Sequence, residues 1–240
     1  MGIKRVIKKV LSPLLSKQEP FMAYKKESWS QSGEDIIIEY LFGLRKIEQP
    51  SCLDIGAYHP MVANNTFKFF RKGSKVVNID ANPAAIEMFK QYRRKDINLN
   101  IGIGAQKGSF DFYIMEDAAL NTFSEAEKES LEKLGNKLKE VKKIAMLPVN
   151  EVLEKYFALK APDLISIDAE GVDIDIIRSF DFSKYSPKVF CIETINYTPD
   201  GTGTRRIDLC DMIETAGYFE YANSNINSIY VNKVWWFAGK

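Results

Sequence analysis

Residues 51–60 read Ser-Cys-Leu-Asp-Ile-Gly-Ala-Tyr-His-Pro, and they contain the first strand that the sequence predicts. A short apolar run that ends in a carboxylate and a glycine predicts a buried strand over 51–55. Similar runs follow at 75–80, 163–168 and 188–194, and amphipathic helical patterns lie at 64–72, 82–94, 150–158 and 173–180. This alternation is typical of βαβ units, so the sequence predicts an α/β fold with a mostly parallel sheet.

The later part of the chain predicts a different end to the sheet. A helix over 204–216 precedes residues 218–222 and 226–231, which flank Asn-Ser-Asn and indicate an antiparallel hairpin. Strands are also predicted at 97–103 and 109–115. Residues 125–143 are rich in Glu, Lys and Leu and predict a pair of solvated amphipathic helices, or alternatively a mobile lid over a site.

The composition excludes several classes of protein. Apolar residues make up 45% of the chain, and 33 Lys and Arg balance 32 Asp and Glu to a net charge of +1, which is typical of a globular protein without a nucleic-acid partner. Cys52, Cys191 and Cys210 are too far apart for a zinc motif or a dense disulfide framework, so we expect a cytoplasmic protein.

The first 17 residues carry a separate pattern. Apolar residues from Ile3 to Leu15 form one helical stripe, and five Lys and Arg lie opposite them with no acid. We expect this helix to pack on the domain. The alternative is an interfacial helix at the inner face of an anionic membrane. Pro13 interrupts the helix in either case.

Acidic residues end four of the predicted strands, where ligands bind in open α/β sheets. The strand ends are Asp54-Ile-Gly56, Asp80-Ala-Asn-Pro83, Asp168-Ala-Glu-Gly171 and Glu193-Thr-Ile-Asn196. Gly56 alone cannot provide the G-x-G-x-x-G cradle of a dinucleotide. Asp80 ends the second strand, where an acid hydrogen-bonds ribose hydroxyls. These observations predict a nucleoside ligand without a pyrophosphate.

These motifs, together with Ser30-Gln-Ser-Gly-Glu-Asp35, His59-Pro60, Asn65-Thr66, Leu120-Asn-Thr122 and Val189-Phe-Cys-Ile-Glu193, resemble the FkbM family of S-adenosylmethionine-dependent methyltransferases. The resemblance covers roughly residues 28–232. It implies the seven-stranded, Rossmann-like class I methyltransferase sheet and S-adenosylmethionine as the cofactor. It also implies cofactor contacts from Gln31, Glu34, Asp54, Gly56, Ala57, Asn65, Thr66, Asp80, Ala81 and Asn82. Tyr58, His59 and Pro60 stand where many members keep further glycines.

Three side chains are candidates for removing a proton from the acceptor. His59 is the only histidine and has a suitable unperturbed pKa, but a structural hydrogen bond to its loop is an equal alternative. Asp168 and Glu170 are the other candidates, as bases or as ligands of acceptor hydroxyls. Asp168 and Glu193 could also hold a divalent ion, although the spacing that identifies such a site is absent.

The resemblance implies O-methylation of a sugar, a glycan precursor or a related small metabolite. The alternatives are a nucleotide-dependent oxidoreductase and a non-catalytic, membrane-associated binding module. We expect a helix and linker over 1–27 and a methyltransferase domain over 28–240, with a helical, lid-like insertion at about 116–147. Acceptor recognition should lie in 115–147 and 197–204, where Phe123 and Tyr197, with Tyr221 nearby, are candidates to stack on a sugar.

Overall fold

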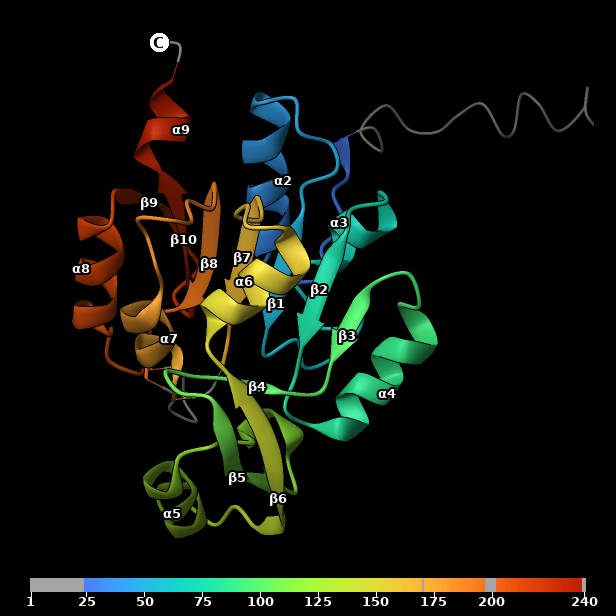
Figure 1. Cartoon of the computed structure of the whole chain (residues 1–240), viewed down its shortest axis with the longest axis vertical. Coiled ribbons are helices and arrows are strands. Elements are labelled where there is room, and N and C mark those ends of the chain that lie inside the picture. Colours follow the sequence, from blue (N-terminus) through green and yellow to red (C-terminus); the bar gives the residue numbers. More distant parts are fainter. Residues whose placement is uncertain (1–23, 170, 197–201, 239–240) are drawn as a thin grey trace, which may run out of the picture.

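The computed structural model describes residues 24–169, 171–196 and 202–238, which form a seven-stranded sheet with helices on both faces and a separate three-stranded sheet (Figure 1). The large sheet has the order β3-β2-β1-β7-β8-β10-β9. Its strands are β1 (Cys52–Ile55), β2 (Val76–Ile79), β3 (Ile97–Leu99), β7 (Leu164–Ile167), β8 (Val189–Glu193), β9 (Tyr218–Asn223) and β10 (Asn227–Asn232). β10 pairs antiparallel with β8 and β9, and the other pairs are parallel. The predicted fold class is confirmed.

Helices cover both faces because the side chains of each strand alternate between them. In β1, Leu53 and Ile55 join the core under α6 (Val149–Phe157), α7 (Asp173–Ser179) and α8 (Ile207–Thr215). Cys52 joins the opposite core under α2 (Glu34–Leu44), α3 (Phe67–Arg71) and α9 (Lys233–Phe237). Asp54 shares the face of Cys52, so a carboxylate lies in the α2 layer.

The helix predicted after the second strand is present as α4 (Pro83–Tyr92). The Asn82 side chain accepts a hydrogen bond from the Ala84 amide at 3.0 Å and caps the helix. Pro83 occupies the first turn, where its missing amide hydrogen is not needed. α4 packs beside β3 and ends next to Arg93.

The second sheet corrects one prediction. It has the order β4-β6-β5, with β4 (Gly102–Ile103), β5 (Gly108–Met115) and β6 (Leu138–Leu147). The short helices η2 (Ala118–Leu120) and α5 (Glu125–Lys133) lie between β5 and β6. The helix pair predicted over 125–143 is wrong from residue 138 onward, because Leu138–Leu147 forms β6 and pairs antiparallel with β5. The strand predicted over 97–103 is likewise divided between the two sheets.

The small sheet and α5 lie beyond the large sheet, on the side toward which the arrow of β2 points (Figure 1). They therefore stand next to the carboxyl ends of the parallel strands. The basic helix predicted over 1–17 falls outside the described residues, and the division of the chain at residue 27 stays a prediction. In the part of the chain that the structure describes, no helix has the length and apolar character to cross a membrane.

Candidate functional site at the carboxyl ends of the strands

Polar residues interrupt five neighbouring strands at matching positions. The pairing register aligns Asn98 of β3, Asn78 of β2, Asp54 of β1, Ser166 of β7 and Cys191 of β8. We call these five residues the polar row. Because buried polar groups without partners are costly, the row requires hydrogen bonds from the loops above it.

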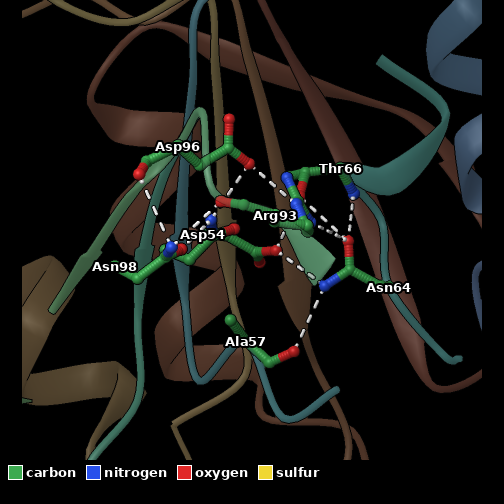
Figure 2. Close-up of polar contacts among 8 residues, drawn as sticks. Asp54, Ala57, Asn64, Thr66, Arg93, Asp96 and Asn98 are labelled. Atoms are coloured by element: carbon green, nitrogen blue, oxygen red, sulfur yellow. Dashed lines mark hydrogen bonds and ion pairs between the residues drawn. The ribbon is translucent and has the colours of Figure 1, made fainter. Parts of the chain in front are cut away.

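Asp54 supplies the centre of this network (Figure 2). Its carboxylate is 3% exposed and accepts hydrogen bonds from Thr66 Oγ1 at 2.8 Å and Asn64 Nδ2 at 3.1 Å. Asn64 Nδ2 also donates to the Ala57 carbonyl at 3.2 Å. Burial raises the pKa of Asp54, and the charge of Arg93 opposes that rise. Asp54 therefore holds the loop that follows β1 from beneath and does not cap α3.

Arg93 is the residue of this network that sequence reasoning missed. Its side chain is fully buried, and its Nε lies 2.7 Å from Asp96 Oδ2. Its Nη1 donates to Asn64 Oδ1 and Thr66 Oγ1, both at 3.1 Å. Burial also raises the pKa of Asp96 against the influence of Arg93. The only sequence signal was the Arg-Arg-Lys-Asp run at the end of the helix predicted over 82–94, and such charged runs are usually solvated.

Asn65 connects the same loop to the rest of the polar row. Its Nδ2 donates to Ser166 Oγ at 3.1 Å and to Cys191 Sγ at 3.5 Å. Asn65 and Thr66 are both predicted cofactor residues. Asn65 hydrogen-bonds to β7 and β8, and Thr66 hydrogen-bonds to Asp54 of β1. The structure brings them together with Asp54 beneath one loop.

The loop after β1 has positive φ angles at Gly56, Tyr58 and Ala63. Gly56 has φ +74°, and a Cβ there would fall 1.7 Å from the Asp168 carbonyl oxygen. Glycine is therefore required where the backbone after β1 closely approaches the backbone after β7. Tyr58 also has a positive φ, of 54°, so a non-glycine residue holds a left-handed conformation in this loop.

His59 lies in this loop with its Nδ1 already engaged. Nδ1 accepts hydrogen bonds from the amides of Met61 at 3.1 Å and Val62 at 3.0 Å. In a neutral imidazole this assignment places the proton on Nε2, which then acts as a donor. The geometry favours the structural alternative for His59 over the general-base alternative.

Asp80 follows β2 and faces the same loop. Its Oδ2 accepts from the Tyr58 amide and its Oδ1 from the Asn82 amide, both at 2.7 Å. Burial raises its pKa to about 6, although these backbone hydrogen bonds favour ionisation. Asn100 Nδ2 donates to the carbonyls of Asp80 at 3.0 Å and Ala81 at 2.9 Å. Sequence reasoning missed Asn100, which fixes the turn that presents Asp80.

Acidic side chains also gather where β7 and β8 end. Burial raises the pKa of Asp168 to about 7, helped by the charges of Asp173, Asp54 and Asp80. Burial and the charge of Asp168 raise the pKa of Glu193 to about 8. Asp173 accepts from Arg206 Nη1 at 2.9 Å and from the Ala169 amide at 2.8 Å, so its charge is compensated. Asp168 and Glu193 are the two carboxyl groups here whose pKa is raised to about 7 and about 8.

Glu127 brings the small sheet to the same edge. Thr122 Oγ1 donates to its Oε2 at 2.7 Å, and a Cβ on Gly171 would fall 2.5 Å from that oxygen. Thr122 belongs to the Leu-Asn-Thr motif, which therefore positions an acid of α5 against the loop after β7. Phe123, a candidate to stack on a sugar, packs on Phe112 with ring centroids 4.7 Å apart.

The segment before α2 lies beside the loop after β1. The Trp29 carbonyl accepts from the Asn64 amide at 2.8 Å, and Gln31 is exposed. Glu34 Oε1 accepts from Ser224 Oγ at 2.7 Å and Asn227 Nδ2 at 3.0 Å. Burial opposes ionisation of Glu34, but these hydrogen bonds lower its pKa. Glu34 thus joins α2 to the C-terminal hairpin.

Two predicted site features have a limited structural test. Glu170 falls outside the described residues. Among the residues that are described, no group of three or more His, Cys, Asp and Glu side chains is arranged to hold a metal ion. Asp168 and Glu193 are near enough for their charges to interact.

Comparison with known proteins gives one family match. The family described as the methyltransferase FkbM domain matches residues 54–219. No curated protein matches the chain. Solved structures that are similar include a TehB-like SAM-dependent methyltransferase from Corynebacterium glutamicum, with 12% identity, TM-score 0.40 and coverage of 94% of this chain and 99% of that chain.

Two further solved structures are also similar to this chain. An O-methyltransferase from Bacillus cereus in complex with SAH has 13% identity and TM-score 0.41, covering 94% of this chain and 95% of that chain. A 1,6-didemethyltoxoflavin-N1-methyltransferase from Burkholderia thailandensis has 9% identity and TM-score 0.40, covering 96% of this chain and 89% of that chain. Such low similarities leave the roles of individual residues to the geometry of this chain.

Proposed function

Because the chain belongs to the FkbM methyltransferase family, we propose that it methylates a hydroxyl of a sugar, a glycan precursor or a related small metabolite. S-adenosylmethionine is the methyl donor of this family, as the sequence motifs implied. The observation that carries the choice of a hydroxyl acceptor is the carboxyl group of Asp168, with its pKa of about 7, at the end of β7.

The carboxylate of Asp80 fits the ribose of this cofactor. Both its oxygens are oriented by backbone amides at 2.7 Å, and no side-chain donor in the described part of the chain reaches it. Each oxygen retains a lone pair, so two vicinal hydroxyls can donate to it. Gly56 and Ala57 would lie along the amino-acid end of the cofactor, with Asp54 supporting their loop from below.

Asp168 is our candidate for the general base. A carboxyl group with a pKa near neutrality is a stronger base than an ordinary aspartate and is still substantially ionised at physiological pH. We rank it above His59, because His59 Nδ1 accepts two loop amides. Glu170 stays a second candidate from the same loop.

The surroundings of Asp168 suit a hydroxyl-bearing acceptor. Glu193 and Glu127 present carboxyl oxygens near the same edge, and these oxygens accept hydrogen bonds from hydroxyl groups. The ionised form of Asp168 would repel an anionic group close to the reacting atom. We therefore expect the reacting part of the acceptor to be neutral and rich in hydroxyls.

The reaction then needs alignment and one proton transfer. When bound, S-adenosylmethionine supplies an electrophilic methyl group and leaves as S-adenosylhomocysteine. Asp168 takes the proton of the acceptor hydroxyl as the oxygen bonds to the methyl carbon. Glu193 and Glu127 hold the other hydroxyls of the acceptor, so that the attacking oxygen points at the methyl carbon. Such positioning supplies a large part of the rate enhancement.

Calorimetry with S-adenosylmethionine, followed by transfer of a labelled methyl group to a panel of acceptors, tests this proposal. The panel should pair each sugar with the amino sugar of the same configuration. We expect labelled ethers from the sugars. Label found only on nitrogen would overturn O-methylation, and absence of cofactor binding would overturn the whole assignment.

A further inference from the structure

A cavity lined mainly by basic residues opens beside α2 and α3. It has a volume of about 560 Å³ and is lined by residues before α2, by α2 itself and by α3. The lining residues are Lys25, Lys26, Glu27, Trp29, Glu39, Lys68, Arg71 and Lys72. None of these residues is among the carboxyl groups that we place at the methyl-transfer site. The cavity is therefore separate from that site.

The cavity is strongly positive. It has five cationic side chains and two carboxylates. Glu39 is shared between Lys68 at 3.3 Å and Lys72, and Glu27 lies 3.5 Å from Lys25. No carboxylate in the described chain forms an ion pair with Lys26 or Arg71. Positive charge is therefore left over, and it faces the cavity.

Lys68 gives the cavity a fixed wall. Its side chain is 8% exposed, and its Nζ donates to the Glu27 carbonyl at 2.6 Å. This bond fixes the segment before α2 against α3. The cavity thus has a buried lysine in its wall, held by the Glu27 carbonyl and the Glu39 carboxylate, and is more than a cluster of mobile surface charges.

Arg71 provides the binding geometry. Its guanidinium carbon lies 4.6 Å from the centroid of the Trp29 ring, which holds the planar group flat. No described acceptor takes a hydrogen bond from its N–H groups. A stacked guanidinium with unused donors is pre-organised for bidentate binding of an oxyanion, and several cations around it favour a multiply charged one.

We infer that this cavity binds a phosphate or diphosphate group, carried either by a small organic phosphate or by a lipid headgroup. The volume accommodates more than an inorganic phosphate. The Trp29 carbonyl also accepts from the Asn64 amide at 2.8 Å, and Asn64 supports the loop after β1. An anion in the cavity is therefore one hydrogen bond away from the cofactor loop.

Titration of the full-length protein with inorganic pyrophosphate, and co-sedimentation with phosphatidylglycerol vesicles, separate the two sources. The test variant is Lys26→Gln/Arg71→Gln. The matched control is Lys46→Gln/Lys95→Gln, which removes the same charge from two exposed positions outside the cavity. Arg71→Lys keeps the charge but removes the planar fork.

We expect the test variant to bind at least one probe about tenfold or more weakly, and the control to bind as the unmodified protein does. Loss with pyrophosphate identifies a soluble phosphate ligand, and loss with vesicles alone identifies a lipid headgroup. Arg71→Lys should bind the probes more tightly than the test variant and more weakly than the control. If the test variant and the control bind both probes equally, the inference is wrong, because the attraction is then general charge.

Discussion

Replacing Arg93 by methionine should lower the free energy of unfolding by about 3–5 kcal/mol at pH 8, because it leaves buried carboxylates without their cation. The side chains of Arg93 and Asp96 are 0% and 1% exposed, so water does not screen the loss. Methionine keeps apolar volume near Phe70 and Phe89, whose rings the guanidinium overlies. The midpoint temperature should fall by roughly 6–20 °C for a chain of this size.

The dependence on pH gives this prediction its sign. Arg93 lowers the pKa values of Asp54 and Asp96, which burial has raised, so its removal raises both further. When the pKa of a carboxyl group is higher in the folded state than in the unfolded state, the folded protein loses stability as the pH rises. The loss begins near the unfolded-state pKa and continues through the folded-state pKa. The variant should therefore be less destabilised at pH 5 than at pH 8.

Urea unfolding followed by tryptophan fluorescence at both pH values measures the effect. Arg94→Met is the control, because Arg94 is the exposed neighbour and its Nε contacts only the Gln91 carbonyl at 3.2 Å. We expect it to change stability by less than about 0.5 kcal/mol. A loss below about 1 kcal/mol for Arg93→Met, or a loss independent of pH, would show that Arg93 does not compensate the buried carboxylates.

Asp80→Asn should weaken S-adenosylmethionine binding by roughly tenfold or more in calorimetry, since two hydroxyls lose a charged acceptor; unchanged affinity would remove Asp80 from the ribose site. Gly56→Ala should unfold at lower urea than Gly135→Ala, because both have positive φ but only Gly56 meets a carbonyl oxygen, at 1.7 Å; equal losses would contradict the clash. Asp168→Asn should lower kcat by about 10²–10⁴ and abolish a rise of kcat/KM near pH 7. It should also gain stability relative to the unmodified protein above pH 7, because the raised pKa makes ionisation of Asp168 costly there; a retained pH profile would exclude Asp168 as the base.

The strands and helices of the large sheet were readable from the sequence because their patterns are local. Each central strand is a short apolar run with a turn residue at its end, and each helix has a stripe on one face. The error over 138–147 arose because lysines and glutamates favour helices, whereas the alternation of Ile144 and Met146 became decisive only through pairing with β5. Propensity was overridden by the partner strand.

The residues at strand ends were predictable for a similar reason, whereas their partners were not. Asp80 and Asp168 follow apolar runs directly, so their position at the carboxyl edge follows from topology. Arg93 reaches Asn64 across 29 residues of sequence, and nothing in its neighbourhood distinguishes it from the solvated Arg94. The hydrogen bonds of His59 Nδ1 depend on loop geometry that no spacing reveals.

The position of β10 between β8 and β9 has a consequence for biosynthesis. β8 pairs with β10, so one edge of β8 stays open until residues 227–232 have left the ribosome. Glu34, at the start of α2, obtains its partners Ser224 and Asn227 at the same late moment. Contacts over such sequence separations slow folding and leave an unpaired strand edge exposed to other chains. The nascent chain is therefore most vulnerable to aggregation just before its final hairpin forms.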